Sequence, residues 1–171
     1  DLPFSQVVQE ALEKGYTEPD PREDLSGNDV GRKLLILARE LDLKNEFSEG
    51  VIENLIPEAL QGLDAPGFLA QMSKLDPIFA KIKAGLAPDE VLRYMGVLGG
   101  DLQKDKGQLS AGLSKVPKQS PLGQVKGADS IIEIYTESYG NRPIVIQGAG
   151  AGATVTARGV FGDILRIVEK N

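Results

Sequence analysis

The order of hydrophobic patterns along the chain predicts an α+β fold. In the first half, most apolar residues recur three and four positions apart, which is the spacing of one helix face. From Val91 onward they alternate with a period of two, as in a strand. Short polar turns separate the later segments, and this favours an antiparallel meander packed under the earlier helices.

Composition limits the class of protein. The chain has 171 residues, 41% of them hydrophobic, and a formal net charge of −6. This size and balance predict one globular domain with its own core. The sequence has no basic run to attract nucleic acid or an anionic membrane, and no apolar run of the ~20 residues that span a bilayer. We expect a cytoplasmic setting and neither of those partners.

The absence of two residue types restricts the chemistry. The sequence contains no Cys and no His. Disulfides and thiolate chemistry are therefore excluded, and so are the commonest general acid–base and the commonest transition-metal ligand. Proton transfer must use Lys, Glu, Asp or Tyr, and we expect no metal site.

The first element is an amphipathic helix that ends at Gly15. Its apolar positions follow the pattern i, i+3, i+4, i+7 and i+8, and they are Phe4, Val7, Val8, Ala11 and Leu12. The chain opens directly on this helix and without a Met. We therefore expect a fragment from the carboxy-terminal part of a larger enzyme.

The next stretch, Gly15–Arg39, joins a charged loop to an apolar helix. Pro19 and Pro21 restrict φ, so the segment Thr17–Arg22 is expected to be rigid and non-helical. Ser26 is the expected N-cap of the helix that follows. The apolar positions predicted to face the core are Val30, Leu34, Ile36, Leu37 and Leu41. Loops held by rigid elements often carry function, which makes this stretch the first candidate site.

From spacing alone, the simplest interpretation of the charges in this stretch is structural. Asp29 and Lys33 are four apart and share one helix face, where an exposed ion pair contributes roughly 0.2–0.5 kcal/mol. Glu18 is then a solvated loop carboxylate. Asp24 belongs to a surface charge cluster that needs no chemical role.

A short strand and a long helix follow the charged connection Leu41–Gly50. Val51–Ile56 is predicted as a strand that stops before a proline. Asp64 is the expected N-cap of a helix that runs to about Ala84, with a break or kink at Pro77. The apolar stripe of this helix is interpreted as core, and its members are Phe68, Met72, Leu75 and Phe79.

The second half of the chain contains the remaining strands. Their predicted ranges are 91–98, 109–113, 131–136 and 143–147. Polar turns separate them, including the Ser/Pro/Gly loop Lys118–Gly127. A final helix is expected from Val155 to about Lys170.

A glycine-rich turn joins the last strand to the last helix. Gly148, Gly150 and Gly152 formally fit the pattern G-x-G-x-x-[GA], which is weak evidence when it stands alone. A complete dinucleotide-binding fold needs another strand, and the remaining residues are helical in pattern. Two interpretations stay open: small residues that allow close strand–helix packing, or backbone N–H groups that approach a cofactor at a helix N-terminus.

Three segments carry a resemblance to a known family. Residues Tyr16–Lys33 read YTEPDPREDLSGNDVGRK, and residues Ile146–Ile167 read IQGAGAGATVTARGVFGDILRI. The first is similar to the signature of the homoserine dehydrogenase family, and the second resembles the terminal segment of that family. The stretch ENLIP at 53–57 also fits. The pattern is most similar to the form fused behind an aspartate kinase. The resemblance implies a mixed, largely antiparallel sheet with helices on one face, like the catalytic domains of homoserine and glyceraldehyde-3-phosphate dehydrogenases, and a homodimer formed through the sheet.

The resemblance also implies a reaction and roles for individual residues. Members of the family interconvert aspartate 4-semialdehyde and homoserine with NADPH or NADH, in the biosynthesis of threonine, methionine and isoleucine. By this likeness Lys33 is catalytic and delivers a proton. Glu18 and Asp29 bind the substrate, and Asp24 is their neighbour.

The same likeness assigns most of the cofactor site to sequence that is missing here. Gly152 is implied to contact the nicotinamide nucleotide, with Gly150 and Gly148 beside it. The amino-terminal nucleotide-binding domain of the family is absent, so residues 1–171 are interpreted as the catalytic and dimerisation domain, inactive by itself. Two other functions stay open, namely a non-catalytic dimerisation module and a free-standing nucleotide-binding protein.

Overall fold

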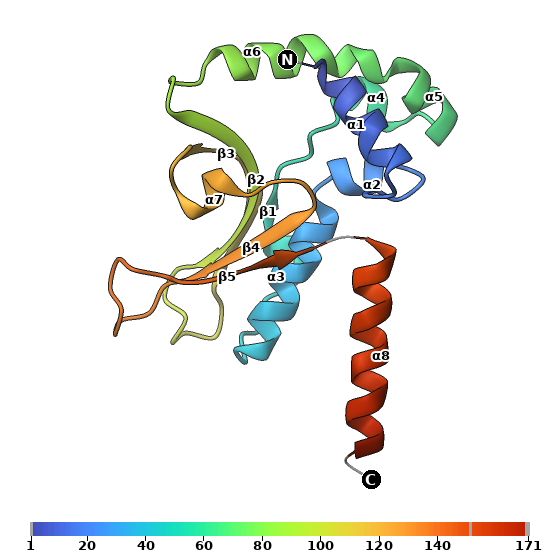
Figure 1. The fold of residues 1–171 in the computed structure, drawn as a ribbon. Helices are drawn as coiled ribbons and strands as arrows, with labels where there is room; N and C mark the ends of the chain where they lie inside the picture. Colours follow the sequence, from blue (N-terminus) through green and yellow to red (C-terminus); the bar gives the residue numbers. More distant parts are fainter. Residues whose placement is uncertain (1, 151, 170–171) are drawn as a thin grey trace.

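The computed structural model describes residues 2–150 and 152–169 (Figure 1). One end of the molecule is helical and combines two parts of the chain. Its elements are α1 (Phe4–Glu13), α4 (Glu58–Gln61), α5 (Ala65–Gln71), the 3-10 helix η2 (Met72–Leu75) and α6 (Asp76–Ala84). α1 packs against η2 and α6, and the rings of Phe4 and Phe79 stack with their centroids 3.6 Å apart.

This helical end contains the larger hydrophobic core. Its buried side chains are Val8, Leu25, Ile56, Leu60, Phe68, Met72, Leu75 and Phe79. The apolar stripe predicted for the long helix is therefore confirmed as core. Asp64 caps α5 by accepting a 2.9 Å hydrogen bond from the backbone N–H of Gly67, and η2 interrupts the helix just before Pro77, as predicted.

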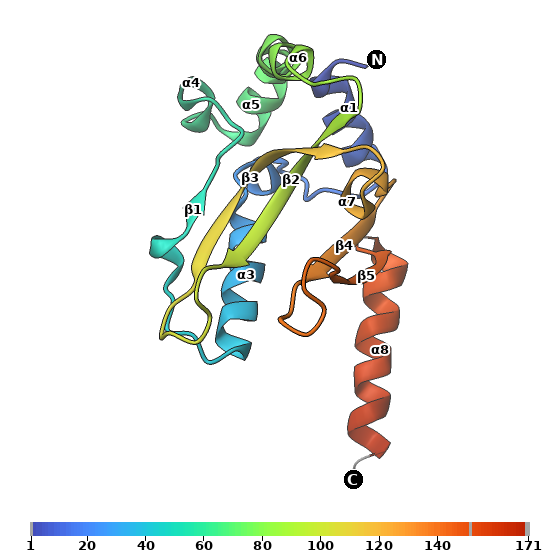
Figure 2. The ribbon, with the colours of Figure 1, turned by 90° about the vertical axis from the view of Figure 1, so that its left-hand side faces the viewer.

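A three-stranded mixed sheet forms the middle of the molecule. Its strands are β1 (Val51–Ile52), β2 (Glu90–Gly99) and β3 (Gln108–Pro117), in the order β1-β3-β2. β2 and β3 are antiparallel, with Tyr94 opposite Leu113, whereas β1 and β3 are parallel, with Val51 opposite Ser110. Helix α3 (Asn28–Glu40) lies along this sheet and packs on β2 and β3 (Figure 2).

The last two strands form a separate hairpin, so the prediction of one continuous meander is wrong. β4 (Asp129–Ile134) pairs only with β5 (Ile144–Ala149) in the part of the chain that the structure describes. The reason is that β3 lies between β1 and β2, which leaves it no free edge for the next strand. The chain leaves β3 through a short helix, α7 (Pro121–Gln124), within the predicted loop.

The final helix stands apart from the helical end. α8 (Ala153–Glu169) extends away from the sheet (Figure 1). Its large apolar residues are exposed. The predicted end at Lys170 lies outside the described residues. None of the helices within residues 2–150 and 152–169 is long and apolar enough to cross a membrane.

The predicted strand Val51–Ile56 is reduced to two residues. Beyond Ile52 the backbone follows the ladder for one more bond, from Glu53 N to Ala111 O at 2.8 Å. Leu55 then donates its N–H to the carbonyl of Leu25 instead, at 2.9 Å. The segment thus leaves the sheet to join the loop before α3.

α3 buries a narrower face than its apolar pattern predicts. The buried positions are Gly31, Leu34 and Ala38. Three predicted core residues are solvent-exposed instead, with exposed fractions of 60% for Ile36, 43% for Leu37 and 53% for Leu41. The helix lies very close to the sheet, because a Cβ atom at Gly96 of β2 would come within 2.8 Å of Val30. Only residues directly above the strands meet them at this separation.

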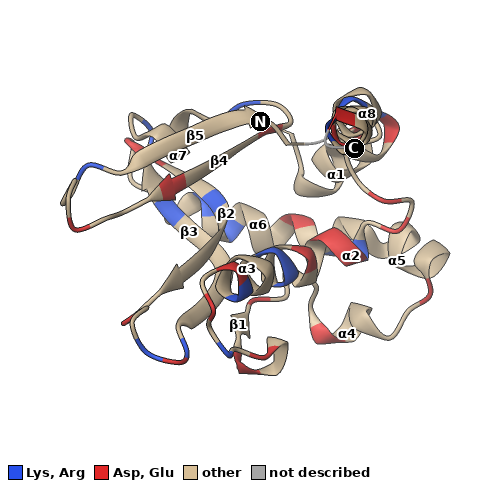
Figure 3. Ribbon diagram, turned by 90° about the horizontal axis from the view of Figure 1, so that it is seen from below, with Lys and Arg blue, Asp and Glu red and all other residues tan. Residues whose placement is uncertain are grey.

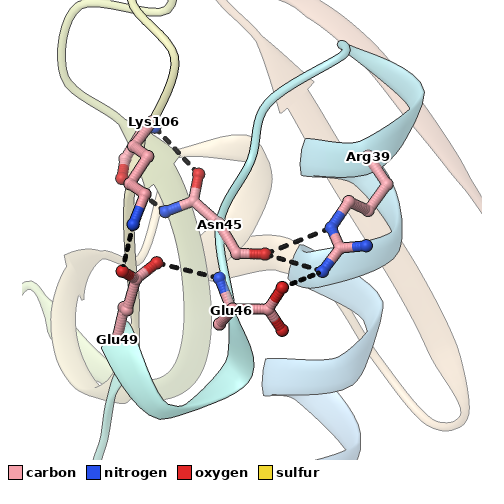
Figure 4. Close-up of polar contacts among 6 residues, drawn as sticks. Arg39, Asn45, Glu46, Glu49 and Lys106 are labelled. Carbon is pink, nitrogen blue, oxygen red and sulfur yellow. Dashed lines mark hydrogen bonds and ion pairs between the residues drawn. The ribbon is translucent and has the colours of Figure 1, made fainter.

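A polar network fastens the C-terminal end of α3 to the turn between β2 and β3 (Figure 4). Asn45 is only 2% exposed, and its side-chain amide exchanges two 2.9 Å hydrogen bonds with the backbone of Gly107. Arg39 donates to the carbonyl of Asn45 at 2.9 and 3.1 Å and pairs with Glu46 at 3.0 Å. The 3-10 helix η1 (Phe47–Glu49) follows directly and leads into β1.

Candidate active site

The loop before α3 folds back as a short helix that sequence reasoning missed. α2 (Arg22–Leu25) begins directly after Pro21, whose fixed φ of −68° suits a helix start. The predicted N-cap, Ser26, is wrong by one residue. The cap position of α3 is Gly27, with a φ of +74°, and the Ser26 hydroxyl donates to the carbonyl of Glu23 at 2.8 Å.

Arg22 holds this loop in place. Its guanidinium forms bidentate hydrogen bonds with Asp20, including Nε to Oδ1 at 2.8 Å, and also donates to the carbonyl of Leu63. The hydrogen-bonded guanidinium of Arg22 lowers the pKa of the Asp20 carboxyl. These charges serve a structural role, since they join the loop to the segment before α5.

Three carboxylates gather between this loop and the first turn of α3. The backbone N–H of Glu18 donates to Asp24 Oδ2 at 3.3 Å. Burial raises the pKa of Asp24, and the charges of Asp29, Glu18 and Glu23 raise it further, while the Glu18 N–H acts in the opposite direction. The structure thus brings the three predicted substrate-binding acids close enough for the charges of Glu18 and Asp29 to act on Asp24.

Lys33 pairs with one of these acids, Asp29, on the same helix. Its Nζ lies 2.7 Å from Asp29 Oδ2, and the two side chains are 68% and 44% exposed. Figure 3 shows acidic and basic residues next to one another along α2 and α3. The amine is therefore on the same face as Asp29 and is open to solvent, which leaves it accessible to a bound ligand.

A large cavity opens beside the acids. Its volume is about 1560 Å³, and Thr17, Asp24 and Asp29 form part of its wall. Most of the remaining wall is apolar and comes from α1, α6 and β2. Glu18 and Lys33 are not among the residues described as lining it.

The glycine turn lies between β5 and α8, as the sequence predicts, although Ala151 within it lies outside the described residues. A Cβ atom at Gly150 would lie 1.8 Å from the Ser130 hydroxyl, so this glycine is required by packing within the hairpin. Added Cβ atoms at Gly148 and Gly152 would meet none of the described atoms within 4 Å. Gly152 has a φ of +117°, which favours glycine for a conformational reason. The backbone hydrogen bonds described for this turn are made within the turn and with the hairpin beside it. For example, the Gly150 N–H donates to the carbonyl of Ala128, just before β4.

Gly31, an unfavourable residue inside a helix, is explained by the fold. A Cβ atom there would come within 2.9 Å of the Phe47 ring and 3.0 Å of Ile52 Cδ1. The start of α3 therefore rests directly on the segment that leads into β1. Tyr94 of β2 also reaches this place, where its hydroxyl donates to the carbonyl of Glu53 at 2.6 Å. The strand pattern placed Tyr94 in β2, but its contact with the helix is non-local and left no signal in the sequence.

The fold and the site define a mixed α+β domain with a cluster of acids and an amine at the start of one helix, and the fold recurs in solved structures. A Candida auris protein of unknown function is 40% identical, with a TM-score of 0.80 over 99% of this chain and 47% of its own. A putative homoserine dehydrogenase from Archaeoglobus fulgidus is 25% identical, with a TM-score of 0.62 over 97% of this chain and 43% of its own.

Sequence relatives define the family. The homoserine dehydrogenase family model matches residues 1–165. A chloroplastic bifunctional aspartokinase/homoserine dehydrogenase from Daucus carota is 46% identical over 96% of this chain and 18% of its own length. A homoserine dehydrogenase from Emericella nidulans is 42% identical over 98% of this chain and 46% of its own length. The chain therefore belongs to the homoserine dehydrogenase family, as the resemblance implied, and spans less than half the length of these relatives.

Proposed function

We propose that the chain is the substrate-binding and catalytic part of a homoserine dehydrogenase. The enzyme reduces L-aspartate 4-semialdehyde to L-homoserine, on the route to threonine, methionine and isoleucine. The observation that carries the proposal is the exposed pair of Asp29 and Lys33, whose charged atoms are 2.7 Å apart beside Asp24. Membership of the family supports the reaction.

The acids suit the task of holding the α-ammonium group of the substrate. The charges of Asp29 and Glu18 act on the Asp24 carboxylate, to which the backbone N–H of Glu18 also donates. A cation placed among these three carboxylates would relieve their mutual repulsion. Charge-assisted hydrogen bonds to a carboxylate are the strong kind, which suits recognition of a charged amino acid. We assign substrate binding to Glu18 and Asp29, with Asp24 supporting them.

Lys33 suits the task of proton transfer. When hydride reaches the carbonyl carbon, negative charge develops on the carbonyl oxygen. The ammonium group of Lys33 stabilises that charge and donates a proton to the oxygen, leaving a neutral amine. Asp29 keeps the amine oriented through the 2.7 Å contact. General acid catalysis of this kind typically contributes about 10²- to 10⁴-fold to the rate.

The nicotinamide cofactor, NAD or NADP, supplies the hydride when it is bound. Gly148 and Gly152 fit a close approach by such a group, because nothing in the described structure would meet a Cβ atom at either position. Gly150 is the weakest of the three candidates, since packing against Ser130 already accounts for it. We assign most of the cofactor site to a nucleotide-binding domain outside these residues, because the relatives are more than twice as long.

The test compares the 171-residue chain with the full-length protein that contains it. Homoserine oxidation is followed with NADP⁺ and with NAD⁺. We expect turnover only in the full-length protein and little or no binding of NADPH to the chain in calorimetry. A full-length protein that folds but does not oxidise homoserine would remove the proposed reaction. Turnover by the chain alone would remove the assignment of a missing domain.

A second function, dimerisation through the sheet, is favoured by the apolar hairpin. Ile132, Ile144 and Ile146 are 48%, 43% and 55% exposed, and contiguous exposed apolar surface is typical of interfaces. We expect a homodimer in light scattering and a monomer after Ile146→Asp. Ile78→Asp, at an exposed position of α6, is the matched control and should stay dimeric. A monomeric wild-type protein would remove this function without affecting the proposed reaction.

Two finer expectations belong to the same proposal. Fractionation of the source cells tests the cytoplasmic setting, because the carrot relative is described as chloroplastic. Superposition on the catalytic domain of glyceraldehyde-3-phosphate dehydrogenases tests the expected likeness of the two folds.

A further inference from the structure

The first turn of α3, which carries Asp29, lies exceptionally close to the residues beneath it. A Cβ atom at Gly27 would come within 1.8 Å of the Tyr94 hydroxyl oxygen, and one at Gly31 within 2.9 Å of the Phe47 ring. Gly27 is also the cap residue, and its φ of +74° would be strained with a side chain. The start of the helix therefore rests directly on Tyr94.

The Tyr94 hydroxyl is fixed from its other side. It donates a 2.6 Å hydrogen bond to the carbonyl of Glu53. Glu53 is itself held to β3, because its N–H donates to Ala111 O at 2.8 Å and its carboxylate accepts from the Leu113 N–H at 2.7 Å. Burial, and then the charge of Glu53, raise the pKa of Tyr94.

Tyr94 also belongs to the wall of the candidate active site. It lines the same cavity as Asp24 and Asp29. Asp29 is the second residue of α3, two positions after Gly27, and Lys33 pairs with it one turn later. A shift of the helix start would therefore move Asp29 relative to the other walls of the cavity, and it would move the paired Lys33 amine with it.

We infer that Tyr94 is a positioning residue for the reaction. By holding Glu53 and supporting Gly27, it determines where Asp29 and Lys33 stand relative to the substrate. The inference rests on the proposed function of those two residues. It assigns Tyr94 no contact with the reacting atoms.

The test is Tyr94→Phe in the full-length enzyme, which keeps the ring and removes only the hydroxyl. We expect kcat for homoserine oxidation to fall by about tenfold or more, because a displacement of about 1 Å in a catalytic group costs up to about 10²-fold. KM for homoserine should rise, whereas KM for the nicotinamide nucleotide should stay within about twofold. A role in overall folding alone would lower the melting temperature and leave kcat of the folded enzyme unchanged.

Hydrogen exchange provides a readout that is independent of activity. The Gly31 N–H donates to the carbonyl of Gly27 at 3.0 Å, and it should exchange faster in Tyr94→Phe while the amides of α6 keep their protection. Tyr135→Phe is the matched control, because that hydroxyl bonds Glu133 at 2.9 Å beside β4. It should leave the exchange of α3 and the kinetic constants unchanged.

If the Tyr94→Phe enzyme does not fold, a second variant, Gly27→Ala, tests the same inference. Gly27→Ala pushes the helix start away from an intact hydroxyl, so it should produce the same loss of kcat and the same rise in homoserine KM. Wild-type kcat in either folded variant, or an equal rise in nucleotide KM, overturns the inference. Inactive wild-type enzyme overturns the proposed function instead, so the two failures are distinguishable.

Discussion

The Nζ of Lys33 lies 2.7 Å from Oδ2 of Asp29, one helical turn earlier, and both side chains remain open to solvent. Exposed ion pairs of this kind contribute little to stability, typically about 0.2–1 kcal/mol. Stability therefore gives little reason for the pair, and the role we propose for it is in binding a ligand. It presents an oriented amine next to a group of acids that includes Asp24.

Replacing the amine tests this interpretation directly. We expect Lys33→Ala in the full-length enzyme to lower kcat by about 10²- to 10⁴-fold, because the proton donor is lost. The melting temperature should barely change, since the side chain is 68% exposed. Lys14→Ala removes another exposed i,i+4 pair, with Glu10, and should leave kcat unchanged. An unchanged kcat in Lys33→Ala would show that the proton comes from elsewhere.

The pH dependence of stability should differ in sign between two acids of the loop. Burial raises the pKa of Asp24 above its ordinary value of 3.8, so folding favours the protonated form. Stability is then lost as the pH rises through the interval between 3.8 and the folded-state pKa. Asp24→Asn keeps an acceptor oxygen and cannot ionise. We expect it to raise the melting temperature of the chain at pH 7, with the gain vanishing well below pH 3.8.

Asp20→Asn is the matched comparison in the same melting series. The hydrogen-bonded guanidinium of Arg22 lowers the pKa of Asp20, so its stabilising effect is present above 3.8 and is lost as the pH falls through the folded-state pKa. We expect this variant to lower the melting temperature at pH 7 and to match the wild type at low pH. Changes of the same sign in both variants would contradict the assigned environments.

Gly31→Ala should destabilise the chain even though alanine is the better helix former. The gain in helix propensity is about 1 kcal/mol. The added methyl group would lie 2.9 Å from the Phe47 ring, and overpacking of this kind costs about 1–3 kcal/mol. Gly159→Ala in α8 is the control, because a Cβ atom there meets nothing within 4 Å, and it should stabilise the chain. Urea unfolding measures the free energy of unfolding of both variants. If Gly31→Ala is as stable as Gly159→Ala, the packing argument is refuted.

Asn45→Ala should destabilise the chain. The side chain is 2% exposed and bonds both the N–H and the carbonyl of Gly107, which is itself half-buried. A buried group left without a partner costs about 1–3 kcal/mol. The free energy of unfolding in urea should therefore fall by about this amount. Asn141→Ala, in the exposed hairpin turn, should change it little, and equal effects would contradict the role of the network.

Sequence alone was sufficient wherever the deciding interaction is local. The Asp29–Lys33 pair follows from i,i+4 spacing, and the Asp64 cap follows from a side chain that reaches a backbone N–H three residues away. The strands β2 and β3 follow from their alternation and the polar turn between them. Such features depend on neighbours along the chain, which the sequence displays directly.

Tertiary structure decided what depends on distant partners. The predicted meander is interrupted because β3 has β1 on one side and β2 on the other, so β4 cannot pair with the strand that precedes it in the chain. Leu37 and Leu41 are exposed because α3 touches the sheet only along its glycine-lined face, near Gly31 and Gly96. The hydroxyl of Tyr94 reaches the start of α3 because the helix lies so close to the sheet. Periodicity shows which residues share a face, but only the packing partner determines which part of that face is covered.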